Sequence, residues 1–363
     1  MNKALWEFSN TYRRYLTLRR FLRITFIVMK FWLGSLWKQI KGNKLSTWER
    51  IRLLIEELGP TYIKFGQVLS TRGECPPLLR DELKKLQDRV PPFSYKEVED
   101  TIEQELAAHI DELFISFNKE PIASASLGQV HEAVLRRGRN QRTKVAVKVQ
   151  RPNIENIIEV DLSLLEFLLQ FLDKFVPRTR IFNLPVIIDA FGTSLRREID
   201  YVLEGRNTDK LALHHKNDET VYIPDIHWDY TTKRVLTMEF IDGIKISEVK
   251  ELDKAGLDRH KIALNMTRAY MKQIFRKGFL HADPHPANLF ILNDEVIAFL
   301  DFGMVEYIDD KLLTDLTELL IALIHDNTGP RLAEEFMNLH TGNKWDVDCP
   351  KKEGGCLKGS TRL

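Results

Sequence analysis

Hydrophobic residues recur at helical spacing over most of the chain, and proline or glycine interrupts the pattern at defined points. Within residues 47–110 the pattern predicts several helices, with breaks at Gly59-Pro60, Pro76-Pro77 and Pro91-Pro92. Ser94, followed three residues later by Glu97, predicts a capped helix start. Longer helical patterns cover residues 154–176, 186–215, 258–278 and 314–326.

Strand patterns lie between these helices. Residues 129–137 and 143–150 flank a polar turn, and the second of them alternates apolar and polar side chains, so together they predict a β-hairpin. Residues 221–230 and 233–243 predict a second pair of strands. Helices and sheets in this order indicate an α+β protein, and we expect two lobes joined at about Glu239 to Gly243.

Residues 20–41 predict a helix with two dissimilar faces. Apolar side chains, two of them Trp, fill most of the helical wheel, and the cations gather within roughly 80°; these are Arg20, Arg23, Lys30, Lys38 and Lys41. This pattern is typical of a helix that lies in the surface of an anionic membrane. The alternative is a helix packed on its own protein with the basic residues facing water.

Composition adds bounds to this picture. The chain has 363 residues, 44% hydrophobic, and a formal net charge of +1, so it is globular and its charge gives no indication of nucleic-acid binding. Because no stretch of about 20 uncharged apolar residues occurs, no membrane-spanning helix is expected. Cys75, Cys349 and Cys356 fit no zinc spacing and indicate reduced thiols. We therefore expect a cytoplasmic, peripherally membrane-associated protein, with an organelle matrix as the alternative.

A polar cluster interrupts the apolar pattern in the C-terminal third of the chain. Asp283 and Asn288 lie in a predicted loop before a short predicted hairpin at residues 289–300, and Asp301 follows that hairpin as the first residue of Asp-Phe-Gly. On adjacent loops these side chains offer two oxygen ligands for Mg²⁺ and one carboxylate near the phosphates of a nucleotide. Lys148 lies on a predicted strand, where an amine pairs with nucleotide phosphates.

The strand lysine, the Asp283–Asn288 loop and Asp-Phe-Gly follow one another in an order and spacing that resemble the UbiB/aarF family of atypical protein-kinase-like proteins. The resemblance extends from about Leu58 to Glu306. Four motifs carry the resemblance: KFGQ at 64–67, ASASLGQV at 123–130, EIDYVLE at 198–204 and HADPHPAN at 281–288. It implies a protein-kinase-like bilobal α+β fold with a helical N-terminal extension that carries Lys-x-Gly-Gln.

The ASASLGQV loop departs from the glycine-rich loop of kinases. Ala123 and Ala125 stand where kinases have glycine, and a Cβ prevents the closest approach of backbone N–H groups to phosphates. The resemblance implies that ADP is held well and that other proteins are phosphorylated little or not at all. It assigns nucleotide binding to Ala123, Ala125, Ser126, Gly128, Val130, Lys148 and Glu239.

The resemblance also implies an ion pair between Lys148 and Glu204, whereas spacing alone favours Glu166, which lies closer in the chain. Lys64 and Gln67 share a helix face, and Lys64 is expected to meet the two acids of Glu-x-Asp. The expected metal ligands are Asn288 and Asp301. The expected catalytic group is Asp283, Lys148, Glu204, Lys64, Gln67, Glu198 and Asp200.

The implied function is that of a Mg²⁺-dependent kinase or ATPase that supports isoprenoid-quinone or membrane-lipid metabolism. It would bind ATP or ADP with Mg²⁺, or alternatively Mn²⁺, and Asp283 would orient or deprotonate the attacking group. The alternative is a nucleotide-sensing pseudokinase that presents lipids to partner enzymes. Expected partners are anionic lipids at residues 20–41, a lipid or quinone-precursor ligand, and enzymes of quinone or lipid biosynthesis.

The chain is expected to comprise five segments. These are a membrane-surface helix at 1–45, a helical extension at 46–120, a kinase-like N-lobe with a helical insertion at 121–240, a C-lobe at 241–340 and a polar tail at 341–363. Members of the family usually continue well past Asp-Phe-Gly and often finish with C-terminal helices that bind or span a membrane. The chain is therefore expected either to rely on its basic N-terminal helix alone or to be a shortened form with an incomplete C-lobe.

Overall fold

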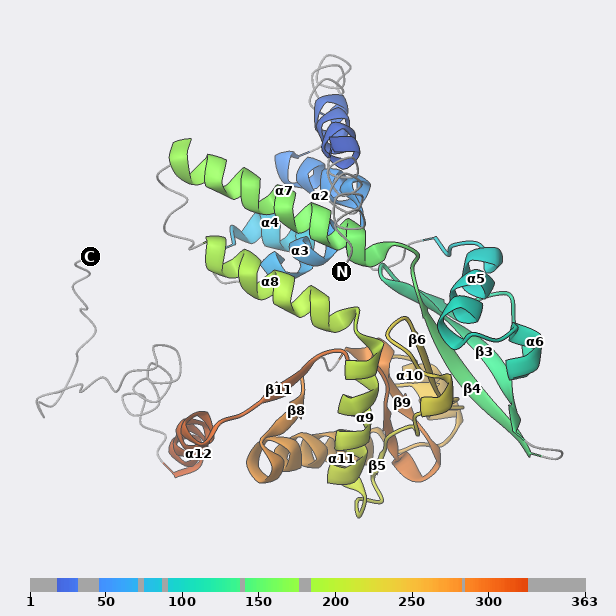
Figure 1. Cartoon of the computed structure of the whole chain (residues 1–363). Helices are drawn as coiled ribbons and strands as arrows, with labels where there is room; N and C mark the ends of the chain where they lie inside the picture. Colours follow the sequence, from blue (N-terminus) through green and yellow to red (C-terminus); the bar gives the residue numbers. More distant parts are fainter. Residues whose placement is uncertain are drawn as a thin grey trace, which may run out of the picture. The chain divides into compact units, whose positions relative to one another are not determined.

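The structure is a computed structural model, shown in Figure 1, that describes residues 18–31, 46–70, 75–86, 91–137, 141–175, 184–282 and 285–325. It divides into two compact units. The first comprises the chain up to Asn265 together with Asp283–Val305, and the second comprises Met266–Ala282 and the chain from Glu306 onward. The five-segment division expected from the sequence stays a prediction.

The first unit begins with short helices. A helix over residues 18–31 is followed by α2 (Thr47–Leu58), α3 (Pro60–Ser70) and α4 (Pro77–Leu83). Gly59 separates α2 from α3 with a φ of 107°, which glycine adopts without a Cβ penalty. The predicted breaks at Gly59-Pro60 and Pro76-Pro77 are therefore confirmed.

The start of α5 (Tyr95–Leu106) shows the predicted cap. The Ser94 side chain accepts from the Glu97 backbone N–H, and the Glu97 carboxylate accepts from the Ser94 backbone N–H, so two otherwise unpaired amides are satisfied. After α6 (Ile110–Leu113) the chain enters a five-stranded sheet.

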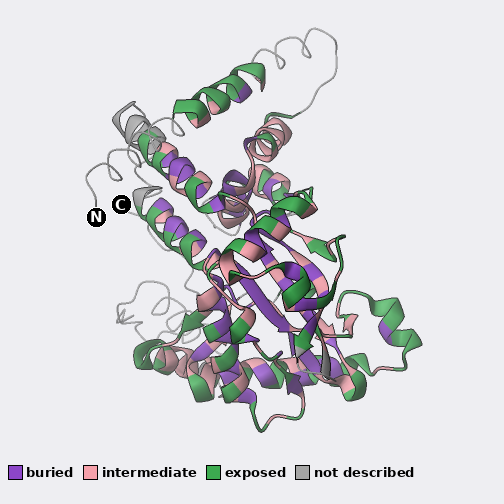
Figure 2. Cartoon of the chain, turned by 45° about the vertical axis from the view of Figure 1, so that its right-hand side comes forward, coloured by how far each residue is buried: buried purple, intermediate pink, exposed green. Residues whose placement is uncertain are grey.

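The sheet is antiparallel, in the order β1-β3-β4-β6, and β2 pairs with β3. Its strands are β1 (Phe114–Phe117), β2 (Ala123–Ser124), β3 (Gly128–Arg137), β4 (Gln141–Gln150) and β6 (Val235–Glu239). The long β3–β4 hairpin confirms the first predicted pair of strands. Figure 2 shows many buried residues, coloured purple, along the strands of this sheet.

One face of β4 belongs to the core. Val145, Val147 and Val149 are fully buried and pack with Val98 and Ile102 of α5. Because successive residues of a strand point to opposite faces, Lys148 points away from this cluster. The alternation predicted from the sequence thus determines which side of the sheet carries the amine.

The second predicted pair of strands is wrong as a pair. β6 joins β4, whereas β5 (Val221–Tyr222) pairs in parallel with β10 (Ile297–Phe299) in another sheet, of order β5-β10-β9-β7. An isolated bridge between Ile226 and Met238 is what remains of the predicted pairing. The buried run at the start of β6 finds its long partner in β4, and pairing of this kind is not determined by adjacency in the chain. The other two strands of that sheet are β7 (Ile244–Lys245) and β9 (Leu289–Ile291).

Three helices lie between β4 and β5 in the chain. They are α7 (Ile154–Phe175), α8 (Leu184–Glu198) and α9 (Tyr201–His215). Apolar residues of α7 and α8 form one cluster with Leu58, Tyr62 and Ile27. The helix at residues 18–31 is therefore packed against the same cluster through its buried Ile27.

Two cations of the predicted stripe face carboxylates of this protein. Arg20 donates to both carboxylate oxygens of Asp161, at 2.7 and 2.9 Å, and to the Leu58 carbonyl at 2.7 Å. Lys30 Nζ lies 2.5 Å from Glu57 Oε1. The helical-wheel pattern of residues 20–41 could not reveal these ion pairs, because both acidic partners lie on other helices. Lys38 and Lys41 are outside the described residues.

The rest of the chain completes the two units. It contains η2 (Trp228–Tyr230), α10 (Val249–Lys254), α11 (Arg259–Lys272), η3 (Gln273–Lys277), β8 (Phe279–His281), η4 (Pro286–Asn288), η5 (Asn293–Glu295), β11 (Val305–Tyr307) and α12 (Asp310–His325). β8 pairs with β11. No helix within the described ranges is long and apolar enough to cross a membrane. Cys75 is a free, buried thiol, and the other two cysteines are outside the described residues.

Candidate functional site

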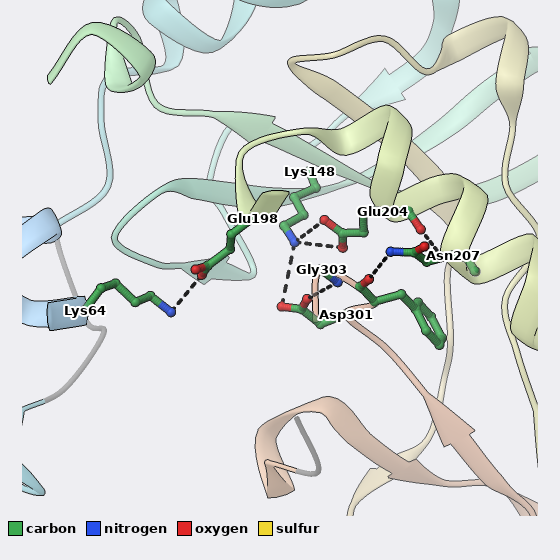
Figure 3. A network of polar contacts seen from close by, with 9 residues as sticks. Lys64, Lys148, Glu198, Glu204, Asn207, Asp301 and Gly303 are labelled. Atoms are coloured by element: carbon green, nitrogen blue, oxygen red, sulfur yellow. Dashed lines mark hydrogen bonds and ion pairs between the residues drawn. The ribbon is translucent and has the colours of Figure 1, made fainter. Parts of the chain in front are cut away.

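Lys148 is held by a buried carboxylate. Its Nζ donates to both carboxylate oxygens of Glu204 on α9, each at 2.9 Å, as Figure 3 shows. The contact expected with Glu204 is present, while Glu166, the alternative that spacing favoured, is exposed on α7. β4 positions the amine because Lys148 lies in register between Val130 of β3 and Leu236 of β6.

Burial makes this ion pair sensitive to pH. The Glu204 side chain is 1% exposed, and burial raises its pKa to about 7, although the Lys148 ammonium opposes the rise and Asp301 adds to it. Burial acts to lower the pKa of Lys148, but the carboxylates of Asp301 and Glu204 outweigh it and the pKa lies above its ordinary value. Lys148 therefore stays charged, and Glu204 is the member of the pair that titrates near neutrality.

Asp301 is the second carboxylate beside the amine. Its Oδ2 lies 3.7 Å from Lys148 Nζ, and its Oδ1 accepts from the Gly303 N–H at 3.2 Å. The side chain is 46% exposed, so one oxygen is held by the turn and the group remains open to solvent. The φ of Asp301 is 64°, in the left-handed region.

Asn288 is brought close to this turn by the backbone. Its carbonyl accepts from the Leu300 N–H at 2.8 Å, in line with the β9–β10 register that places Leu289 opposite Phe299. His285, for which no role was expected, caps η4 by accepting from the Ala287 N–H through Nδ1. Asp283 lies outside the described residues, so its expected role stays a prediction.

The donor set suits a hard divalent cation. Asn288 and Asp301 supply a carbonyl and a carboxylate oxygen, the ligands that Mg²⁺ prefers. Among the described residues, no three His, Cys, Asp or Glu side chains come together as a metal cluster. A Mg²⁺ bound here would therefore need oxygens of a nucleotide or water in addition to those of the protein.

The alanine-rich loop uses one of its amides internally. Ala123 pairs with Val130 across β2 and β3, and the Ala125 N–H donates to the Gly128 carbonyl at 2.8 Å. Ser126 is completely buried. Since Ala125 also carries a Cβ, this turn offers a phosphate one amide fewer than an open glycine-rich loop.

Gly128 has a packing reason to be glycine. A Cβ at this position would lie 2.5 Å from Tyr201 Oη and 2.6 Å from the Val149 carbonyl oxygen, which is closer than atoms can approach. Tyr201 is itself 1% exposed and lies with its ring 5.0 Å from Lys148 Nζ. Tyr201 lies inside the EIDYVLE motif, but no role for it was expected from the sequence.

The remaining motif residues have identified neighbours. Lys64 Nζ on α3 lies 2.8 Å from Glu198 Oε1 at the end of α8, which is the contact expected for the first acid of Glu-x-Asp. Asp200 caps α9 by accepting from the Leu203 N–H at 3.0 Å, a role that the sequence did not indicate. Gln67 donates to the Leu86 carbonyl at 3.3 Å.

Glu239 ends β6 at the expected junction between the lobes. Its carboxylate accepts from the Tyr222 hydroxyl, at 2.9 and 2.7 Å. Burial and then this hydrogen bond raise the pKa of Tyr222 to about 12. Its expected part in nucleotide binding stays a prediction.

Lys148 lies on a five-stranded antiparallel sheet, is held by the buried Glu204 of a helix, and lies beside the Asp-Phe-Gly turn. This combination is that of a protein-kinase-like domain. Residues 85–332 match the ABC1 atypical kinase-like domain, and the chain belongs to this family. The family resemblance seen in the sequence is therefore confirmed.

Named relatives agree with this assignment. The chain is 40% identical to UbiB of Marinobacter nauticus over 281 residues, covering 76% of this chain and 50% of that protein. It is 38% identical to the Synechocystis protein slr1919, covering 91% and 59% of the two chains. It is 36% identical to the chloroplastic protein ACTIVITY OF BC1 COMPLEX KINASE 8 of Arabidopsis thaliana, covering 85% and 42%. The chain thus spans about half the length of the curated relatives it matches.

A solved structure shows the same fold. It is that of Rv3197 from Mycobacterium tuberculosis, described as a complex with erythromycin, and it matches with a TM-score of 0.55 at 23% identity. The match covers 68% of this chain and 60% of that one. At this identity the likeness concerns the fold alone.

Proposed function

We propose that the chain binds an adenine nucleotide with Mg²⁺ and either hydrolyses it or transfers its terminal phosphoryl group to a small molecule, in support of isoprenoid-quinone or membrane-lipid metabolism. The observation that carries the proposal is the position of Lys148 Nζ, 2.9 Å from Glu204 and 3.7 Å from Asp301. A fixed amine beside an open carboxylate is the arrangement that holds phosphates next to a metal ion. The similarity to UbiB supports the link to quinone metabolism.

Each residue has a distinct part in this proposal. Lys148 binds phosphate oxygens, and Glu204 holds the amine in place. Asn288 and Asp301 hold Mg²⁺, which when bound neutralises charge on the phosphates. Asp283 orients or deprotonates the attacking hydroxyl or water. The family resemblance implies that the helix face carrying Lys64 covers the place where a kinase would admit a peptide, and the ion pair of Lys64 with Glu198 supports this arrangement; a small molecule is therefore proposed as the acceptor.

A thermal-shift titration tests this function. ATP and ADP, each with and without Mg²⁺, are added to the wild type, to Asp301→Asn, and to Asp229→Asn as a control with an exposed carboxylate in η2. Ligand at about 100 times its Kd stabilises by about 2.7 kcal/mol, so a clear shift is expected for the wild type and the control. Asp301→Asn is expected to lose the Mg²⁺-dependent part of the thermal shift. In a separate assay of phosphate release, the same variant is expected to be roughly 100-fold slower than the wild type. A wild type that responds to neither nucleotide would reject the proposal.

A nucleotide-sensing pseudokinase is the second candidate. The observation in its favour is the internal hydrogen bond from the Ala125 N–H to the Gly128 carbonyl, because it withdraws an amide from a γ-phosphate. This candidate predicts stabilisation by nucleotide without measurable phosphate release. Release that depends on Asp301 would exclude it.

We further propose that the helix at residues 18–31 attaches the protein to an anionic membrane surface. One row of its side chains is apolar and more than half exposed, at 58, 58, 65 and 53% for Leu18, Leu22, Phe26 and Met29. Arg19 and Arg23 are exposed beside this row, which is the combination that lipid headgroups and acyl chains favour together.

Sedimentation with anionic vesicles tests this attachment. Phe26→Asp is expected to lower binding about tenfold or more, because the transfer of a Phe side chain is worth ~2 kcal/mol. Val186→Asp is the matched control, since Val186 is an equally exposed apolar residue, at 59%, on α8. Equal loss in both variants would argue against a specific role for this helix.

A further inference from the structure

Asn207 joins α9 to the Asp301 turn. It lies one helical turn after Glu204, so the two side chains project from the same face of α9. Asn207 Nδ2 donates to the main-chain carbonyl of Phe302 at 3.0 Å, and the residue is 6% exposed. Figure 3 shows this bond beside the Lys148–Glu204–Asp301 contacts. Neither the spacing of the chemical motifs nor the family resemblance indicated this residue.

The turn needs such an anchor. Asp301 has a φ of 64°, and residues with a Cβ adopt the left-handed region only where their surroundings hold them there. Its own Oδ1 accepts from the Gly303 N–H, and the residue before it is held by the Leu300–Asn288 backbone bond. On the other side of Asp301, the Phe302 side chain is fully buried.

The Phe302 carbonyl is the point where a side chain of α9 contributes a hydrogen bond to this arrangement. The hydrogen bond to Asn207 is itself buried, and a buried carbonyl that loses such a donor is destabilised, which favours its rotation toward water. Rotation of the peptide that joins Phe302 to Gly303 would move the Gly303 N–H away from Asp301 Oδ1. The Asp301 carboxylate would then lose the orientation that keeps its Oδ2 3.7 Å from Lys148 Nζ.

We propose that Asn207 is a positioning residue that fixes the Asp301 carboxylate for metal binding and couples it, through α9, to the Lys148–Glu204 pair. The inference rests on the proposed Mg²⁺-nucleotide function for its consequence, but the coupling itself is a property of the fold. α9 thus holds the site at two points, the amine through Glu204 and the metal-binding turn through Asn207.

The chain offers a matched control for this role. Asn265 Nδ2 donates to the Glu295 carbonyl at 3.1 Å, and Asn265 is 2% exposed. Asp294 and Glu295 have φ values of 59 and 58°, so this buried amide also secures a left-handed turn. Asn265→Ala therefore removes the same kind of bond from a turn that carries none of the proposed site residues.

The first readout is hydrogen–deuterium exchange of the peptide that spans residues 300–304, measured without ligand. Asn207→Ala and Asn207→Leu are compared with Asn265→Ala and the wild type; the Leu variant fills the space without a donor. Both Asn207 variants are expected to speed exchange in this peptide about tenfold, whereas Asn265→Ala leaves it unchanged and speeds exchange around residues 293–296. If Asn207→Ala does not fold, Asn207→Leu carries the comparison.

The second readout is the Mg²⁺ concentration that gives half of the nucleotide-dependent thermal shift. In the Asn207 variants it is expected to rise about fivefold to tenfold, the effect of one buried hydrogen bond, while the shift by nucleotide without metal is unchanged. Asn265→Ala is expected to match the wild type. Unchanged exchange at 300–304 in both Asn207 variants would overturn the inference, as would a Mg²⁺ midpoint equal to that of Asn265→Ala. A wild type without any nucleotide response would instead reject the proposed function, while the exchange result would still decide the coupling.

Discussion

Lys64 on α3 and Glu198 at the end of α8 form an ion pair of 2.8 Å directly beside the Asp-Phe-Gly turn. A Cβ placed on Gly303 would lie 3.9 Å from Glu198 Cγ, so the carboxylate-bearing side chain is in contact range of the turn. Both charged side chains are about one-fifth exposed. The pair is therefore less screened than a surface pair, and it is in a position to affect the site.

A double-mutant cycle on this pair tests its strength. Lys64→Met, Glu198→Gln and the double variant are expected to give a coupling free energy of about 1 kcal/mol in urea unfolding, at the upper end for partly exposed pairs. The control is the pair of Lys233 with Glu155, at 3.0 Å but about half exposed at both ends, where no resolvable coupling is expected. Equal coupling in the two cycles would show that the position of Lys64 adds nothing.

The Glu204 carboxyl is expected to make stability depend on pH. Burial raises its pKa from 4.5 to about 7, so the folded state holds a proton that the unfolded state releases. The stability from this group is present below pH 4.5 and is lost as pH rises through 7. Relative to Glu204→Gln, the wild type should lose up to about 3 kcal/mol between pH 5 and 8. Urea unfolding of both proteins at the two pH values checks this, and a difference that stays constant or grows in favour of the wild type at pH 8 contradicts it.

Gly128→Ala is expected to destabilise the fold by about 1–3 kcal/mol, the usual range for overpacking. Its Cβ would collide with Tyr201 Oη and with the Val149 carbonyl oxygen. Tyr201→Phe removes only the first collision, so the double variant is expected to recover part of the loss. Thermal unfolding of the three variants measures this. If Gly128→Ala is as stable as the wild type, the loop glycine has no packing role.

Arg20→Ala is expected to destabilise by about 3–5 kcal/mol, because it leaves a buried carboxylate without its partner. The Asp161 side chain is 0% exposed, whereas Arg20 is 15% exposed. Arg19→Ala, an exposed arginine next to it on the same helix, should be neutral. The measurement is urea unfolding of both variants. Similar small effects in both would mean that the helix contributes little to the first unit.

Local elements were predictable from the sequence wherever neighbouring residues determine them. The capping box at Ser94 and Glu97, the β3–β4 hairpin and the breaks at Gly59 and Pro76 all depend on residues close together in the chain. Strand partners were less predictable: β5 and β6 are neighbours in the chain but lie in different sheets. The competition among distant strands decides such pairing, and no local pattern records it.

The candidate site shows the same division. Lys148 and Asp301 could be found from motifs, and Glu204 only from the family resemblance, since spacing favoured Glu166. The contacts of Asn207 with Phe302 and of Arg20 with Asp161 join residues far apart in the chain. Each contact pairs a polar group that the fold buries, and which groups are buried is known only once the fold is known.

The position of Arg20 also bears on how the protein should be cut for laboratory work. The family match begins at residue 85, and a fragment trimmed to that boundary would lack the only arginine that pairs, among the contacts described here, with Asp161. It would also remove Leu58 and Tyr62 from the apolar cluster around α7. In such a fragment the Asp161 carboxylate would lack its arginine partner, and the apolar surface around it would be exposed to water. Expression trials should therefore retain the segment from residue 18.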